Sequence, residues 1–146
     1  MTGFFATKSR VSNFFASSAF RSDPTFNTNY TADGAVWCYD TTNALGWQGL
    51  GVAAGTAATG GVFASGIAPV ADTFQTLVVA LMDGLGFFAI LDADHNEIIT
   101  SGSVGITGAV TKTTLLAPYV YVEARSATSK TVAIDRIHAW GARTTT

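Results

Sequence analysis

The residues best suited to metal binding are Asp92, Asp94 and Asn96, which recur at alternate positions. This spacing matches the first half of a calcium-binding loop, in which side-chain oxygens surround the ion. Such a loop also needs a glycine at its sixth position and a bidentate glutamate at its twelfth, where this chain has Glu97 and Ser103. Because Asp, His and Asn are common turn residues, we interpret residues 93–96 as a hairpin turn and predict no metal and no cofactor.

An acid–base or nucleophilic site needs side chains that are scarce in this chain. The two histidines, His95 and His138, have no nucleophile elbow of the G-x-S-x-G kind beside them. The two glutamates are Glu97 and Glu123, and Glu123 stands beside Arg125 on one face of a predicted strand, which indicates a solvated or interfacial face. We expect His138 to be partly buried or to lie at an interface. We predict that the chain is not an enzyme.

Glycine clusters at residues 49–51, 60–61 and 84–86 could suggest a phosphate-binding loop. That chemistry needs a helix N-terminus aimed at the phosphate and usually a lysine after the glycines. No lysine occurs between Lys8 and Lys112. The sequence therefore excludes a phosphate loop of this kind.

Aromatic residues are the remaining sign of function. Near the N-terminus they form a candidate assembly interface, which consists of Phe4, Phe5, Phe14, Phe15, Phe20 and Phe26. A second set could stack on a sugar ring or on a partner protein, and consists of Trp47, Tyr119, Tyr121 and Trp140. The same residue types are favoured in β-sandwich cores and in subunit interfaces, so we favour packing over sugar binding for the second set.

Composition limits the class of partner. Of the 146 residues, 48% are hydrophobic and 12% are charged, and the formal net charge is −2. Soluble proteins usually have about 25% charged residues, so much of this surface is neutral or apolar and suits burial against neighbouring subunits. The charge gives no footprint for nucleic acid or an anionic membrane. The apolar stretch 77–91 is shorter than the roughly 20 residues of a membrane-spanning helix. We expect protein partners and a homo-oligomer.

The second half of the chain has the pattern of antiparallel strands. Residues 74–82 end at Asp83-Gly84, a dipeptide suited to a type I′ hairpin turn, and residues 86–92 follow as the partner strand. Residues 97–101 form the next strand. Residues 118–125 and 130–140 form a final pair around a turn at 126–129. Many short strands separated by turn residues indicate an all-β sandwich or barrel, and we predict an antiparallel β-sandwich.

The first half divides into two regions of different composition. Residues 1–30 are rich in phenylalanine and predict an arm, either extended or partly helical, and residues 31–146 predict the β-sandwich domain. Residues 31–71 are dominated by Gly, Ala and Thr, which indicates short strands with wide loops or a flexible linker. Residues 35–40 are the best strand candidate there, and Cys38 is expected to be a small core residue.

The stretch YVYVEARSATSKTVAIDRIHAW, residues 119–140, resembles the paired final strands of lectin-like (concanavalin-type) and jelly-roll sandwiches. With its low charge and aromatic N-terminal residues, the chain resembles virion proteins of tailed bacteriophages, above all capsid decoration (cement) proteins and then tail or fibre domains. The resemblance implies a structural subunit, located in the virion, that oligomerises and clamps neighbouring capsid or tail subunits. The alternative is a carbohydrate-binding or receptor-binding domain, with a glycan as its ligand.

Overall fold

The computed structural model describes residues 2–6, 21–22, 25–26, 33–39, 45–102, 105–114, 116–120 and 131–141. Within these residues the chain is all-β. The strands are β1 (Thr2–Ala6), β2 (Arg21–Ser22), β3 (Thr25–Phe26), β4 (Asp33–Cys38), β5 (Gln48–Ala53), β6 (Thr56–Ala57), β7 (Phe63–Ala64), β8 (Thr76–Met82), β9 (Leu85–Leu91), β10 (Glu97–Thr100) and β11 (Ala117–Val120). No helix in this described part is both long enough and apolar enough to span a bilayer.

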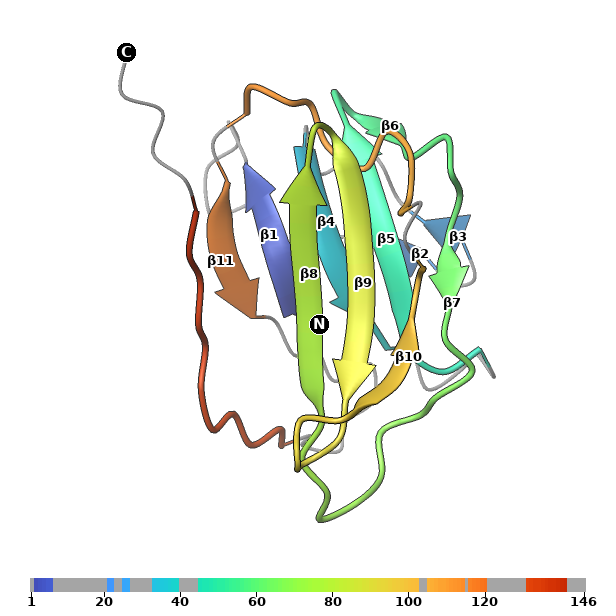
Figure 1. The fold of residues 1–146 in the computed structure, drawn as a ribbon. Helices are drawn as coiled ribbons and strands as arrows, with labels where there is room; N and C mark the ends of the chain where they lie inside the picture. Colours follow the sequence, from blue (N-terminus) through green and yellow to red (C-terminus); the bar gives the residue numbers. More distant parts are fainter. Residues whose placement is uncertain are drawn as a thin grey trace.

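The strands form antiparallel sheets, as the sequence predicts. A six-stranded sheet has the order β11-β1-β4-β5-β6, with β7 also paired to β5. A three-stranded sheet has the order β10-β9-β8, and β2 pairs with β3 in a short ribbon. The three-stranded sheet lies across one face of the larger sheet, with β8 and β9 in front of β1, β4 and β5 (Figure 1).

The hairpin between β8 and β9 confirms the prediction for this segment. Met82 pairs with Leu85, and the two turn residues have positive φ angles of 53° at Asp83 and 79° at Gly84. These angles define a type I′ turn, whose twist matches that of the two strands. The register continues without a shift to Thr76, so the hairpin is regular along its length. The predicted strand 97–101 is confirmed as β10.

The core between the two sheets is built around Trp37 of β4. Its indole ring is fully buried and meets Phe88 of β9 nearly edge to face, with ring centroids 5.4 Å apart. A second ring, that of Phe63, lies 5.8 Å away. The indole Nε1 donates a hydrogen bond of 2.8 Å to the backbone carbonyl of Val78 in β8. Trp37 therefore joins the sheets through both apolar packing and a hydrogen bond.

Within the glycine-rich middle of the chain, residues 48–53 form the buried strand β5 and not a flexible linker. Every residue of β5 except its last is buried. A Cβ atom on Gly49 would lie 2.6 Å from Cγ of Phe88, and one on Gly51 would lie 2.5 Å from Cα of Ala109. Glycine at these two positions lets the opposite elements approach the β5 backbone closely.

Two further predictions for this half of the chain are confirmed. The strand expected at residues 35–40 is β4, which begins and ends two residues earlier. Cys38 is a core residue with 3% of its surface exposed.

Part of the predicted arm lies within the large sheet. β1 pairs with β4 on one side and with β11 on the other, so Thr2–Ala6 forms an inner strand there. This strand brings the backbone of Phe4 and Phe5 opposite Ala35 and Gly34. The division into an arm of residues 1–30 and a domain of residues 31–146 stays a prediction.

The prediction of a final paired strand at residues 130–140 is wrong for the described residues. Residues 131–141 have no strand pairing, and every one of them is exposed. The segment runs beside the edge strand β11 in Figure 1 without joining it. The alternation of Val132 and Ile134 predicted a strand, but alternation alone does not specify a partner strand.

Candidate assembly surface

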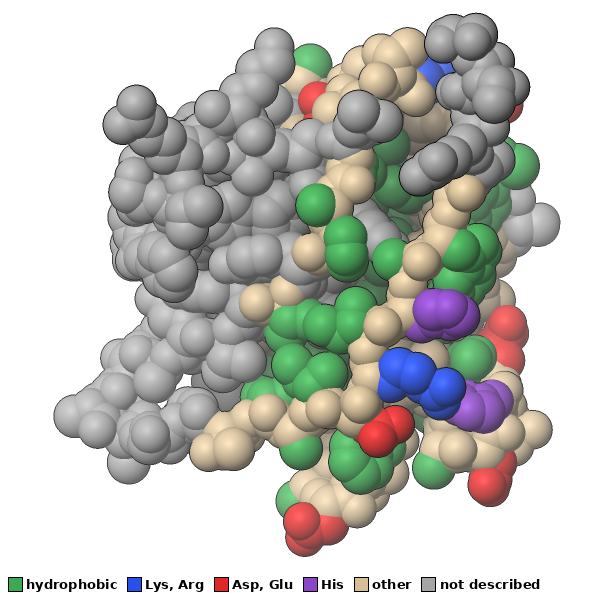
Figure 2. Space-filling model, turned by 90° about the vertical axis from the view of Figure 1, so that its left-hand side faces the viewer, with side chains coloured by type: hydrophobic (Ala, Val, Ile, Leu, Met, Phe, Trp, Pro, Cys, Tyr) green, Lys and Arg blue, Asp and Glu red, His purple; other side chains and the backbone are tan. Residues whose placement is uncertain are grey.

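The segment of residues 131–141, called here the C-terminal segment, presents large apolar side chains to solvent. Their exposed fractions are 57% for Val132, 48% for Ile134, 56% for Ile137 and 81% for Trp140. Figure 2 shows the molecule from the side on which this segment lies, with both hydrophobic and charged side chains on that face. Exposed apolar side chains gathered along one segment are a common feature of surfaces that bind other molecules.

Trp140 and His138 form the one aromatic pair of the C-terminal segment within the described residues. Their ring centroids are 5.2 Å apart and the rings are tilted by 53°. Both side chains are exposed. The expectation that His138 is partly buried is therefore wrong for this chain alone, and its place at an interface stays a prediction.

The outer edge of β8 is a second surface on which a partner could bind. β8 is the last strand of its sheet in the part of the chain that the structure describes. Its core-facing residues Leu77, Val79 and Leu81 pack against the core but are only partly buried. On the neighbouring strand β9, Phe88 and Ile90 have no exposed surface. The core side chains of β9 are therefore fully buried, whereas those of β8 remain partly exposed to solvent.

Residues 92–96 form a tight hairpin turn, as the sequence predicts. One oxygen of Asp92, Oδ1, accepts hydrogen bonds of 2.9 Å from the backbone N–H groups of Asp94 and Asn96. His95 has a φ of 65°, the left-handed geometry of a turn. Asp92 Oδ1 and Oδ2 both also lie within 3.5 Å of the Asn96 amide nitrogen. The Asp92 carboxylate is therefore hydrogen-bonded within the turn, which argues against a calcium site at these residues.

The Asp92 carboxylate also makes the stability of this turn depend on pH. The hydrogen bond from the backbone N–H of Asn96 is the main reason that the pKa of Asp92 lies below its ordinary value. Because the folded-state pKa is lowered, the ionised carboxylate stabilises the fold above the unfolded pKa, and this contribution is lost as pH falls through the folded pKa. We expect Asp92→Ala to unfold at lower urea concentration than the natural chain at pH 7, and the difference to shrink at about pH 3.

Urea unfolding of Asp94→Ala provides the control, because the structure gives the Asp94 side chain no hydrogen bond and only its backbone N–H is bonded. A difference between Asp92→Ala and the natural chain that is the same at both pH values contradicts the prediction.

The two members of the predicted aromatic set whose side chains the structure describes, Trp47 and Trp140, have separate ring partners. Trp47 is partly buried, donates from Nε1 to Gln75 over 3.0 Å, and lies 5.5 Å from the ring of Tyr39. Trp140 is highly exposed and contacts His138. Tyr119 lies on β11, where the structure gives its backbone position, and Tyr121 lies outside the described residues. Of this set, Trp140 has the exposure that a binding residue needs.

The predicted phenylalanine interface is described only in part. Phe4 and Phe5 belong to β1 and Phe26 belongs to β3. Phe14, Phe15 and Phe20 lie outside the described residues. The role of these six residues in assembly stays a prediction.

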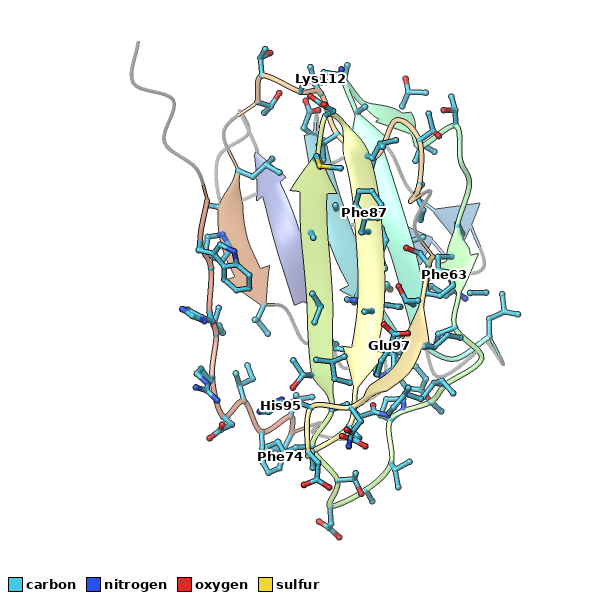
Figure 3. The ribbon with its side chains drawn as sticks, in the orientation of Figure 1. Phe63, Phe74, Phe87, His95, Glu97 and Lys112 are labelled. Carbon is cyan, nitrogen blue, oxygen red and sulfur yellow. The ribbon has the colours of Figure 1, made fainter. Side chains whose placement is uncertain are left out.

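No metal-binding cluster forms among the described residues. No three of their His, Cys, Asp and Glu side chains lie together as a metal site. His95 and Glu97 lie at the end of the small sheet near Phe74, and Lys112 lies at the opposite end (Figure 3). Lys112 approaches Asp83 at 3.9 Å, but both side chains are mostly exposed, so this ion pair contributes little. Glu123 and Arg125 lie outside the described residues.

The open edge of β8 and the unpaired C-terminal segment were not predicted from the sequence. Both follow from which strands are neighbours, and a strand's own residues do not determine its neighbours. One feature of the sequence bears on the open edge of β8. Residues 73–82 carry no charged side chain, although edge strands are commonly protected by charge.

Comparison with known proteins gives no relative for this chain: no family model, no curated protein and no solved structure matches it.

Proposed function

We propose that this chain is a non-enzymatic structural subunit of a larger particle and that neighbouring protein chains bind its C-terminal segment. The observation that carries the proposal is the exposure of Val132, Ile134, Ile137 and Trp140 along one unpaired stretch of backbone. Burying such side chains contributes roughly 25 cal/mol per Å² of apolar area removed from water. The low fraction of charged residues, 12%, fits a surface that is covered in the assembled state.

The class of particle that we propose is the virion of a tailed bacteriophage, with the chain as a capsid decoration (cement) protein bound to capsid or tail subunits. Two features support this. The low charge and the aromatic N-terminal residues resemble those of such virion proteins, and two antiparallel sheets packed around Trp37 and Phe88 fit a β-sandwich.

A pair of matched substitutions tests the proposal. Val132 and Val70 are the same residue type with nearly equal exposed fractions, 57% and 59%, but Val70 lies in the loop before β8. We expect Val132→Asp to weaken self-association by about tenfold or more, because an unpaired carboxylate would be buried in the interface. Val70→Asp leaves association unchanged. Sedimentation velocity over a range of concentrations measures both.

Equal association of the two variants and the natural chain contradicts the proposal. Circular dichroism spectra recorded on the same samples verify that each variant retains the β-sheet signal of the natural chain.

A carbohydrate-binding domain is the second candidate function, favoured by one observation. Trp140 is 81% exposed and stands beside His138, which could donate a hydrogen bond to a sugar hydroxyl. A glycan array tests this candidate. A hit that disappears in Trp140→Ala supports sugar binding, whereas an array without hits argues against it.

A further inference from the structure

We infer that the C-terminal segment of a second copy of this chain adds as a strand to the outer edge of β8. The inference rests on the proposed function, for which it names the partner and the surface. It would extend the three-stranded sheet to four strands, in the order β10-β9-β8 followed by the segment of the second copy.

The backbone of β8 is suited to accept this strand. In a two-residue type I′ hairpin the residues that close the turn, Met82 and Leu85, form a hydrogen-bonded pair. Hydrogen-bonded and non-hydrogen-bonded pairs alternate along an antiparallel ladder. The N–H and C=O groups of Leu77, Val79 and Leu81 therefore point away from β9, toward an edge where no described strand lies.

The side chains at this edge also leave room for another strand. Leu77, Val79 and Leu81 point toward the core but remain partly exposed, because no described strand covers their outer side. Apolar side chains from an added strand would cover them. Val132 and Ile134 have the spacing of two residues that places both on one face of a strand.

Charge places no barrier against this pairing. Residues 73–82, which include all of β8, contain no charged side chain. Within residues 131–141 the charged side chains are Asp135 and Arg136, which are adjacent and of opposite sign. Two copies can therefore bring segment and edge together without like charges facing each other.

The position of the segment in this structure favours a second copy as the partner. The chain's own segment stays exposed along its full described length and is not paired to β8. Two copies related by a twofold axis would each donate a segment and each accept one, so both open edges would be filled. An exchange that does not close would instead link copies into a larger array.

Disulfide cross-linking between variants that each carry one added cysteine tests this arrangement. Ala80 is an exposed residue on the outward face of β8, and Ala133 is exposed between Val132 and Ile134. Ala80→Cys is mixed with Thr131→Cys, Ala133→Cys or Asp135→Cys in turn, because a disulfide needs its Cβ atoms about 3.5–4.5 Å apart and so reports the register. The natural Cys38 is 3% exposed and stays in every variant.

We expect one of these mixtures to give, under mild oxidation, a covalent dimer containing one of each variant. Thr56→Cys, on the exposed edge strand β6, replaces Ala80→Cys in the control mixtures and gives at least about tenfold less product. The double variant Ala80→Cys/Ala133→Cys distinguishes a segment of the same chain from a segment of a second copy, because the disulfide forms within one chain in the first case and between chains in the second.

Two results overturn the inference, and a third contradicts the proposed function as well. One is a disulfide that forms within single chains of the double variant and not between chains, which assigns the edge of β8 to the chain's own segment. The other is a natural chain that associates while no mixture exceeds the control, which leaves the proposed function standing and places the second copy elsewhere. A chain that does not associate at all contradicts both proposals.

Discussion

Replacement of Trp37 by alanine is expected to lower the free energy of unfolding by about 3–5 kcal/mol. The indole is fully buried between the two sheets and packs against Phe63 and Phe88, so its removal leaves a cavity where the sheets meet. The carbonyl of Val78 also loses its 2.8 Å hydrogen bond from Nε1. Urea unfolding followed by circular dichroism measures the change.

Trp37→Phe separates the two contributions. It keeps an aromatic ring against Phe88 and removes the Nε1 donor, so we expect a smaller loss of about 1–3 kcal/mol. If both substitutions change the free energy of unfolding by less than about 0.5 kcal/mol, Trp37 is not at the centre of a shared core.

The second large effect is expected from a chain that ends after Lys130. Because residues 131–141 are exposed throughout and pair with no described strand, their removal takes almost no buried apolar surface from the folded chain. We expect a change of only a few degrees in Tm, and complete loss of self-association at concentrations where the natural chain assembles. Differential scanning calorimetry measures the first effect and light scattering measures the second.

A full-length variant serves as the control for chain length. In this variant serine replaces the exposed apolar side chains of the C-terminal segment, which are Val132, Ile134, Ile137 and Trp140. It should behave like the shortened chain, since the apolar side chains and not the number of residues provide the association energy. If truncation unfolds the protein while this variant stays folded, the backbone of the segment belongs to the folded domain.

Local signals in the sequence predicted the small sheet well. The Asp83-Gly84 dipeptide specifies a type I′ turn, because both residues tolerate positive φ, and the turn then fixes the register of β8 and β9. The Asp92 turn followed from side chains that bond to the backbone next to them. Interactions of this kind involve near neighbours in the chain, so a single sequence is sufficient to predict them.

The glycine-rich strand β5 could not be predicted from the sequence as firmly as β8 and β9. Gly49 and Gly51 disfavour a strand when the segment is considered alone. Their place is explained by Phe88 and Ala109, which approach the β5 backbone from distant parts of the chain. Only the tertiary arrangement shows that glycine here makes room for the core.

The pairing of the C-terminal segment also could not be predicted from the sequence alone. Val132 and Ile134 indicated an extended segment, and the structure leaves that segment exposed at 57% and 48% for these two side chains. Residues 118–125 were predicted as the partner strand because they are close in the sequence. Strand pairing, however, depends on which backbone edges are free. The free edge that we propose for the C-terminal segment is that of β8, which lies far from it in the sequence.

The molar mass in solution tests the central claim, assembly through the C-terminal segment, most directly. Light scattering coupled to size-exclusion chromatography is run on the natural chain and on the chain ending after Lys130, each over the same range of concentrations. We predict for the natural chain a mass that is a multiple of 15.2 kDa and falls on dilution, and for the shortened chain a monomer at every concentration. A natural chain that stays at 15.2 kDa throughout, or a shortened chain that assembles as the natural one does, contradicts the claim.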